Sequence, residues 1–276
     1  MKTQIFLLLL VFSVLSTILT NENKTDENKN IKFITYNVLA DQVEIEKRVP
    51  EIFKILKNAD ADIIALQEVA PWFLELLQKE AWVKNYHFPK IKNEIMVARG
   101  LLILSKAPIT NVLADFLPSR QHRGYLIIET KIKNLDIKIG TCHLESPLES
   151  GPWRAQQLEV FFKHLNTSDN AVLLGDFNFG DGEQPETAKL PNDYTDIWLL
   201  TNKDKPGFTW DIEKSVMAKR GSFPNEKSRR IDRILVKSKW LTPLESKIVG
   251  DTAIDKSNEL FPSDHFGLFG SVTIKE

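Results

Sequence analysis

The chain has 276 residues, of which 42% are hydrophobic and 26% are charged. This composition is that of a folded globular protein, and it excludes a collagenous or low-complexity chain. The 36 Lys and Arg residues balance 37 Asp and Glu residues, which excludes a globally basic nucleic-acid coat protein but allows a local basic face. The single cysteine, Cys142, excludes an intrachain disulfide and a cysteine-based zinc cluster.

The first twenty residues predict a signal peptide. A short basic start precedes an apolar run over residues 5–19, which is shorter than a bilayer span of about 20 residues but is typical of a signal-peptide core. Residues 21–30 are polar throughout and predict a disordered spacer. We therefore expect secretion or residence in the secretory-pathway lumen, without a stable membrane span after cleavage. The alternative is a membrane anchor formed by the uncleaved segment.

The remaining residues, 31–276, predict one α/β domain. Apolar runs with strand periodicity lie at residues 31–38, 62–66, 101–104, 125–132, 136–141, 171–174, 231–236 and 267–274. Helical periodicity fits residues 43–57, 72–79 and 153–165. Strands outnumber helices, and helices separate some of the strands. This pattern favours a sandwich of two mixed β-sheets with helices on the outside.

Polar side chains follow several of these predicted strands, at the point where each strand ends. Asn37, Glu68 and His143 each end or follow a run, and Asp176 and Asn178 follow another. Strand ends at one edge of a rigid sheet can hold a site with precision. Because these side chains are of the types that bind metals and phosphates, the pattern indicates a functional site.

Six motifs in this order resemble the endonuclease/exonuclease/phosphatase superfamily. They are Thr35-Tyr36-Asn37, Leu66-Gln67-Glu68-Val69, Thr141-Cys142-His143-Leu144, Gly175-Asp176-Phe177-Asn178, Ile231-Asp232-Arg233 and Ser263-Asp264-His265. One such motif alone occurs by chance, whereas six in order are specific. The resemblance covers residues 31–276 and implies a four-layer, DNase I-like catalytic domain.

Longer stretches are similar to the type 2 tyrosyl-DNA phosphodiesterases. They surround His143, Arg154, residues 190–198, Trp210 and His265. Two positions depart from that family's pattern: Leu39 stands where an Asp is usual, and Gly180 stands where an Arg is usual. The start at residues 36–41 is more similar to the messenger-RNA deadenylase branch.

The resemblance implies how a cation would be held for phosphodiester hydrolysis. Glu68 is the expected Mg²⁺ ligand, because Mg²⁺ prefers carboxylate oxygen. Asn37 supports the metal or its water, and Asp264 helps hold either the metal or a neighbouring histidine. Mn²⁺ is expected to be able to replace Mg²⁺.

The same resemblance implies the groups that act on water and phosphate. Asp176 orients or deprotonates the attacking water and Asn178 positions it. His265 donates to a phosphate oxygen with support from Asp232, and His143 is a second donor. Ser146 is an expected phosphate contact.

Residues 203–239 predict a nucleic-acid contact. They hold 11 Lys and Arg against 5 Asp and Glu, and Arg233 and Trp210 lie among them. Arginines beside an aromatic ring suit a single strand with a stacked base. The alternative is a solvated basic loop.

We therefore predict a Mg²⁺-dependent phosphodiesterase that acts on nucleic-acid ends, with 5′-tyrosyl-DNA phosphodiesterase activity as the leading hypothesis. One alternative is a secreted nuclease or a sphingomyelinase-like phospholipase of the same superfamily. Another is a catalytically inactive binding module. We expect the protein to be a monomer.

Overall fold

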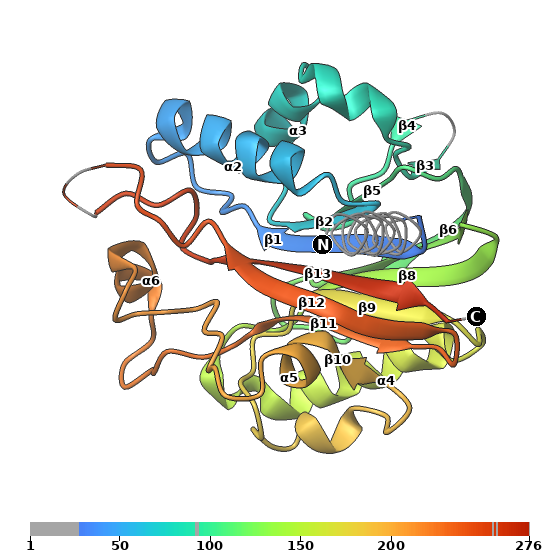
Figure 1. Cartoon of the computed structure of the whole chain (residues 1–276). Coiled ribbons are helices and arrows are strands. Elements are labelled where there is room, and N and C mark those ends of the chain that lie inside the picture. Colours follow the sequence, from blue (N-terminus) through green and yellow to red (C-terminus); the bar gives the residue numbers. More distant parts are fainter. Residues whose placement is uncertain (1–27, 92–93, 256, 258, 276) are drawn as a thin grey trace, which may run out of the picture.

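The computed structural model describes residues 28–276, except residues 92–93, 256, 258 and 276. Two β-sheets pack face to face and helices cover their outer faces (Figure 1). The predicted sandwich of two mixed sheets is therefore confirmed. The predicted signal peptide over residues 1–20 lies outside the described residues, as does most of the predicted spacer. Asn30, the last residue of that spacer, is the first residue of strand β1.

The first sheet has the strand order β12-β13-β1-β2-β5. Its strands are β1 (Asn30–Asn37), β2 (Ile63–Gln67), β5 (Leu102–Ser105), β12 (Leu241–Val249) and β13 (Gly267–Ile274). β1 and β2 run parallel, while β13 lies antiparallel to β1 and β5 lies antiparallel to β2. The sheet is therefore mixed, with the parallel pair at its centre.

The second sheet has the strand order β10-β11-β9-β8-β7-β6. Its strands are β6 (Ile109–Phe116), β7 (Gly124–Ile132), β8 (Leu135–His143), β9 (Ala171–Asp176), β10 (Thr195–Asp196) and β11 (Asp232–Lys237). β8 and β9 run parallel, and β11 lies antiparallel to β9. A separate hairpin consists of β3 (Lys90–Ile91) and β4 (Glu94–Ile95).

Helices cover the two sheets from outside (Figure 1). The α-helices are α2 (Ile45–Ala59), α3 (Pro71–Leu77), α4 (Gly151–Leu165), α5 (Ile197–Thr201) and α6 (Val216–Gly221), and 3₁₀ turns span Ala81–Asn85, Leu148–Ser150 and Thr187–Lys189. α2 and α3 pack on the first sheet and α4 packs on the second. None of the helices in the described part of the chain combines the length and apolarity needed to traverse a bilayer.

The alternation of side chains along the strands explains the layers. Phe33 and Leu174 point into the core between the sheets, where Ile139 and Val172 also pack. Ile34, next to Phe33, points instead to the outer face, against the helices. Strands whose two faces are both covered read as nearly continuous apolar runs, which is why residues 31–36 show so little polar alternation.

The sequence patterns missed the edge strands β6 and β12. β6 is largely exposed or half-buried along its length, so it lacks the apolar run that identifies a central strand. β12 contains Pro243 beside an irregularity in its pairing with β13. Proline is tolerated on an edge strand because only one side of that strand must donate hydrogen bonds.

The two parallel pairs bring polar groups to one edge of the sandwich. In the first sheet Asn37 lies opposite Gln67, the residue before Glu68. In the second sheet Asp176 lies between His143 on β8 and Asp232 on β11. Because the sheets pack face to face, the strand ends of both sheets meet at this edge.

Gly175 is required where β9 ends. Its φ is +146°, and a Cβ at this position would lie 2.2 Å from the carbonyl oxygen of Cys142 on β8. We expect Gly175→Ala to lower the free energy of unfolding by about 2 kcal/mol or more, because both the backbone conformation and the close approach of two strands oppose a side chain.

Gly182→Ala is the matched control for chemical denaturation of that variant. Gly182 also has a positive φ, +77°, but a Cβ there would meet no atom within 4 Å. The control should lose about 1 kcal/mol from its backbone conformation alone. Equal losses in the two variants would contradict the role of the close contact between β8 and β9.

Candidate active site

A buried carboxylate, Asp176, lies at the centre of the strand ends. Its Oδ2 accepts a hydrogen bond from Asn37 Nδ2 at 3.1 Å, and its Oδ1 accepts one from the backbone N–H of Asn178 at 3.0 Å. The Nε2 atoms of His143 and His265 lie 3.4 and 3.6 Å from Oδ2. Burial raises the pKa of Asp176 to about 7, although the charge of His265 opposes this shift. A carboxyl group with such a pKa can take a proton from water at neutral pH.

His265 is paired with a second buried carboxylate, Asp232. The distance between His265 Nδ1 and Asp232 Oδ2 is 2.9 Å, and an ionised carboxylate only accepts, so Nδ1 carries a proton. Burial alone would lower the pKa of His265, but the charges of Asp232 and Asp176 raise it well above its ordinary value. The ring is therefore an imidazolium, with Nε2 as a charged donor on the side of Asp176.

His143 has the opposite protonation state. Arg123 Nη1 lies 3.0 Å from His143 Nδ1, and a guanidinium can only donate, so Nδ1 accepts and Nε2 carries the proton. Burial lowers the pKa of His143 well below its ordinary value, and the charges of Arg123 and His265 lower it further. The site thus combines a neutral donor at His143 with a charged donor at His265.

Glu68 lies beside this cluster and is more open to solvent. Its side chain is 29% exposed, and its φ of +60° is unusual for a residue with a side chain. Asn37 Nδ2 donates to Oε1 at 3.2 Å, and the backbone N–H of Ala40 donates to Oε2 at 2.9 Å. Among the described residues, Glu68 pairs with no Lys or Arg, and the neutral ring of His143 lies 4.0 Å from its Oε1. A half-open carboxylate without a Lys or Arg partner fits a cation that retains bound water.

Two groups of side chains in the site could hold a cation. Asp176, Asp232 and His265 each offer a ligand atom, and these atoms lie within 4.8 Å of one another. However, the imidazolium of His265 already supplies a positive charge to both carboxylates and has no free lone pair on Nδ1. The half-exposed carboxylate of Glu68 suits a hard divalent cation better. Asp264 also lies near, and burial raises its pKa, with the charge of Glu68 contributing.

The structure brings Asn178 and Ser146 to the edge of the site. Asn178 has a φ of +54°, and its Nδ2 donates to the Leu144 carbonyl at 3.0 Å, so its side chain links the ends of β8 and β9. Ser146 Oγ accepts from Arg123 Nη2 at 2.6 Å. Both residues therefore lie beside the site. Asn178 contacts Asp176 directly, whereas Ser146 is linked to His143 by Arg123.

Trp210 is beside the site, but it is not an open stacking surface. It is 7% exposed and packs against Ala218 and Ile231. Its ring centroid lies 4.9 Å from that of His265, and its buried Nε1 has no hydrogen-bond partner. In this structure Trp210 packs against the His265 ring and is almost fully buried.

Arg233 does not join the cluster. It is 2% exposed, and its guanidinium donates to the Phe179 carbonyl and to Asp181, each at 3.0 Å. Burial lowers the pKa of Arg233 to about 10. Acidic and carbonyl groups within the protein thus occupy donors of Arg233, and its contact with a substrate stays a prediction.

Ion pairs also neutralise other Lys and Arg side chains of residues 203–239. Six cations of this stretch are in ion pairs: Lys214, Arg220, Arg229, Arg230, Arg233 and Lys237. The excess of positive charge counted along residues 203–239 is therefore not one free basic face. Much of it neutralises carboxylates of neighbouring segments.

Arg123 is the site residue that sequence analysis missed. It is placed by the turn that connects β6 to β7, and its guanidinium reaches both His143 and Ser146. Burial lowers its pKa, although the charges of Asp176 and Glu68 oppose this. A lone arginine in a polar turn carries no sequence motif, and only the register of β7 against β8 brings it to the site.

Comparisons with known proteins agree with this geometry. Residues 34–265 match the model of the endonuclease/exonuclease/phosphatase family. Tyrosyl-DNA phosphodiesterase 2 from Homo sapiens is 26% identical over 273 residues, covering 95% of this chain and 74% of the relative. The Xenopus laevis protein of that name is 27% identical, covering 93% of this chain and 70% of the relative.

Solved structures share the fold. The D. rerio tyrosyl-DNA phosphodiesterase 2 complexed with a single-strand DNA product has a TM-score of 0.75 at 22% identity, covering 88% of this chain and 99% of that one. The human nocturnin catalytic domain has a TM-score of 0.65 at 18% identity, covering 91% and 96%. These identities establish the four-layer architecture and not the substrate.

The prediction of secretion, with its alternative of a membrane anchor, is wrong. The curated relatives are tyrosyl-DNA phosphodiesterases 2, whose name gives tyrosyl-linked DNA as their substrate, and this similarity overturns the prediction. The apolar run over residues 5–19 is a compositional signal only, and it lies outside the described residues. Such a run is not specific enough to outweigh similarity along the rest of the chain.

We expect Arg123→Met to lower kcat/KM by about 100-fold. The change removes the hydrogen-bond donors to His143 and Ser146. It also removes the positive charge beside the expected position of the substrate phosphate. Steady-state kinetics on a phosphodiester substrate tests this. Arg120→Met, which alters an exposed arginine three residues away in the same turn, is the control. Similar kcat/KM values for the two variants would show that Arg123 has no part in the site.

Proposed function

Since the chain belongs to the endonuclease/exonuclease/phosphatase family and is therefore a hydrolytic phosphodiesterase that depends on a divalent metal, we propose that it cleaves 5′-tyrosyl phosphodiesters at nucleic-acid ends. The names of the relatives support this substrate. The DNA product bound to the D. rerio protein supports a nucleic-acid end as the substrate. The chain spans between 66% and 74% of the length of these relatives, so the activity of the whole relative is carried over as a proposal.

One observation carries the proposal. Asp176 is a carboxylate buried between one neutral and one protonated histidine, and Glu68 lies on the far side of the Asn37 amide. This arrangement supports a base, two phosphate donors and a cation ligand that act on one phosphate. A binding module without catalysis would have no reason to bury these groups together, because each costs free energy to desolvate.

The residues of the chain divide the hydrolytic step among them. Asp176 accepts a proton from the attacking water, whose oxygen bonds to phosphorus as the bond from phosphorus to the tyrosyl oxygen breaks. His265 and His143 donate to the non-bridging phosphate oxygens, and the charge of His265 offsets the charge that develops there. The departing phenolate takes a proton from water. Because water attacks phosphorus directly, no covalent enzyme intermediate forms.

We assign the cation to Glu68, with Asn37 and Asp264 supporting it or its water. Mg²⁺ is the cation we propose, and Mn²⁺ would replace it, since both accept carboxylate and amide oxygen. When bound there, such a cation would withdraw charge from a phosphate oxygen.

The nucleic-acid strand would lie on the side of α6. Lys219 and Phe223 are exposed there, and a cation beside an aromatic ring suits a sugar–phosphate backbone with a stacked base. Trp210 forms the inner wall of this side, next to His265.

We expect Glu68→Gln to reduce kcat by at least about 100-fold with Mg²⁺ while the thermal melting temperature stays within a few degrees, because the change removes the ligand charge but conserves the shape of the side chain. The substrates should be a 5′-tyrosyl oligonucleotide, plain single- and double-stranded DNA, poly(A) and sphingomyelin, each with Mg²⁺ and with a chelator. Glu245→Gln, on the edge strand β12, is the control.

Preferred cleavage of the tyrosyl oligonucleotide, abolished by the chelator and by Glu68→Gln, is the predicted result. Preference for plain DNA, poly(A) or sphingomyelin would refute the proposed substrate but retain the chemistry. Full activity of Glu68→Gln would refute the assignment of the cation.

A further inference from the structure

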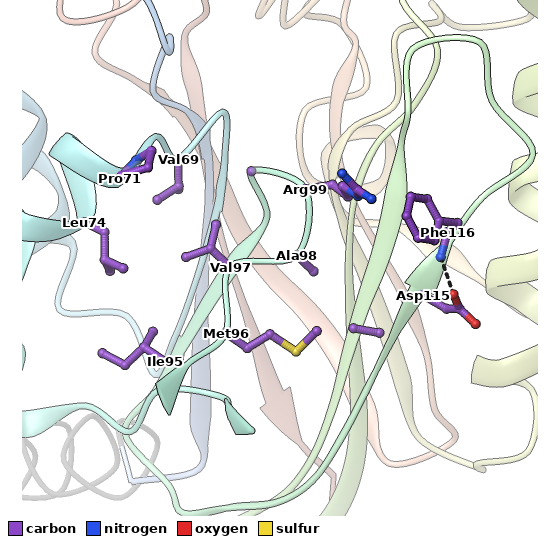
Figure 2. A pocket seen from close by; sticks show the side chains of 12 residues that line it. Val69, Pro71, Leu74, Ile95, Met96, Val97, Ala98, Arg99, Asp115 and Phe116 are labelled. Carbon is purple, nitrogen blue, oxygen red and sulfur yellow. Dashed lines mark hydrogen bonds between the residues drawn. The ribbon is translucent and has the colours of Figure 1, made fainter. Parts of the chain in front are cut away.

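An apolar pocket of about 700 Å³ opens between the edges of the two sheets. Figure 2 shows Val69, Leu74 and Val97 on one side of it and Arg99 and Phe116 on the other. The first group belongs to the side of the first sheet, and Phe116 ends β6 of the second. This volume lies within the range of small-molecule ligand pockets.

One wall of this pocket continues directly from Glu68. Val69 is the next residue, and its backbone N–H donates to the Gly100 carbonyl at 2.9 Å. Gly100 also lies against the backbone of Glu68, since a Cβ on it would be 3.5 Å from Glu68 Cα. The pocket therefore lies directly beside Glu68, the proposed cation ligand.

The opposite wall continues from Arg123. Phe116 pairs with Gly124, the residue after Arg123, across the β6–β7 hairpin. The side chain of Arg99 lies against Gly124, because a Cβ there would be 3.0 Å from Arg99 Cγ. Both walls thus start beside residues of the site, Glu68 on one side and Arg123 on the other.

The Asn37 amide links the proposed base and the proposed cation ligand. Its Nδ2 donates to Asp176 at 3.1 Å and to Glu68 at 3.2 Å. Attack by water and departure of the leaving oxygen are roughly in line through phosphorus. If the phosphate lies between Asp176 and a cation at Glu68, as proposed, water activated by Asp176 expels the leaving group on the side of Glu68 and of the pocket beyond it.

The chemistry of the pocket suits an aromatic ring. Its walls are mainly aliphatic, and the guanidinium of Arg99 lies 4.0 Å from the centroid of the Phe116 ring. Phe116 is 57% exposed, so a ligand ring could cover it and could also contact the guanidinium. A sugar–phosphate backbone would find one cation here and an exposed carboxylate, Asp115, next to it.

We propose that this pocket is the leaving-group subsite, which holds the phenol ring of the tyrosyl group and the peptide residues beside it. This assignment rests on the proposed function. It separates the two halves of the substrate, with the nucleic-acid strand on the side of α6 and the protein adduct between the sheet edges.

The test compares two ligands of equal charge. Each is the same 3′-labelled oligonucleotide, with either a 5′-tyrosyl-peptide phosphodiester or a 5′-methyl phosphodiester, and Kd is measured by fluorescence anisotropy in chelator so that no turnover occurs. We expect the wild-type chain to bind the tyrosyl ligand more tightly. Phe116→Ala should raise its Kd about 3- to 10-fold, as loss of an aromatic contact predicts, and should change the Kd of the methyl ligand less than twofold.

A second variant and a control complete the test. Ala114→Phe fills the pocket from β6 and should raise the same Kd, independently of Phe116. Leu244→Ala removes an exposed apolar side chain from the other edge strand and should leave both Kd values unchanged. Equal losses for both ligands in the Phe116 variant would assign the pocket to the nucleic acid and overturn the proposal. Unchanged Kd values in both pocket variants, or equal wild-type affinity for the two ligands, would also overturn it.

The failure of the proposed function has a different signature. Wild-type chain that binds the tyrosyl ligand through Phe116 but does not cleave it with Mg²⁺ would refute the activity and not the subsite. Cleavage of the tyrosyl oligonucleotide at equal rates by wild type, Phe116→Ala and Ala114→Phe, at substrate concentrations below KM, would refute the subsite and retain the activity.

Discussion

The buried carboxylate of Asp176 is the group on which the site depends. A charge without solvent is tolerated only when donors surround it, and each donor here comes from a different part of the fold. Asn37 ends β1, Asn178 follows β9, His143 ends β8 and His265 precedes β13. These donors come close to Asp176 only because the two sheets pack against each other.

The partner on the Nδ1 side of each ring explains the opposite states of the two histidines. His265 has Asp232 on its other nitrogen and stays protonated, whereas His143 has Arg123 there and stays neutral. One donor is thus charged and the other is not, and the site avoids two adjacent imidazolium ions. Three residues at the strand ends have unusual backbone conformations, because Glu68, Asn178 and Gly175 all have positive φ. Residues in such conformations cluster at functional sites.

Much of this could be predicted from the sequence, for an identifiable reason. A strand buried on both faces is an apolar run, and the polar residue that ends it marks the edge of the sheet, so Asn37, Glu68, His143 and Asp176 were visible. Arg123 was not, because its position depends on hairpin register. The ion pair of Arg233 with Asp181 could not be predicted either, because a count of charges along the chain does not show which charges meet in the fold. Secretion was predicted wrongly, from a short apolar segment whose composition alone is ambiguous.

The most direct test of the account is the position of the cation. Crystals soaked with Mn²⁺ and the 5′-phosphorylated product oligonucleotide would locate it by anomalous scattering. The account predicts a single peak at the carboxylate of Glu68, with the phosphate between it and Asp176 and within hydrogen-bond distance of His143 and His265. A peak held instead by Asp176, Asp232 and His265 would contradict it, because those groups would then be metal ligands and not the base and the charged donor.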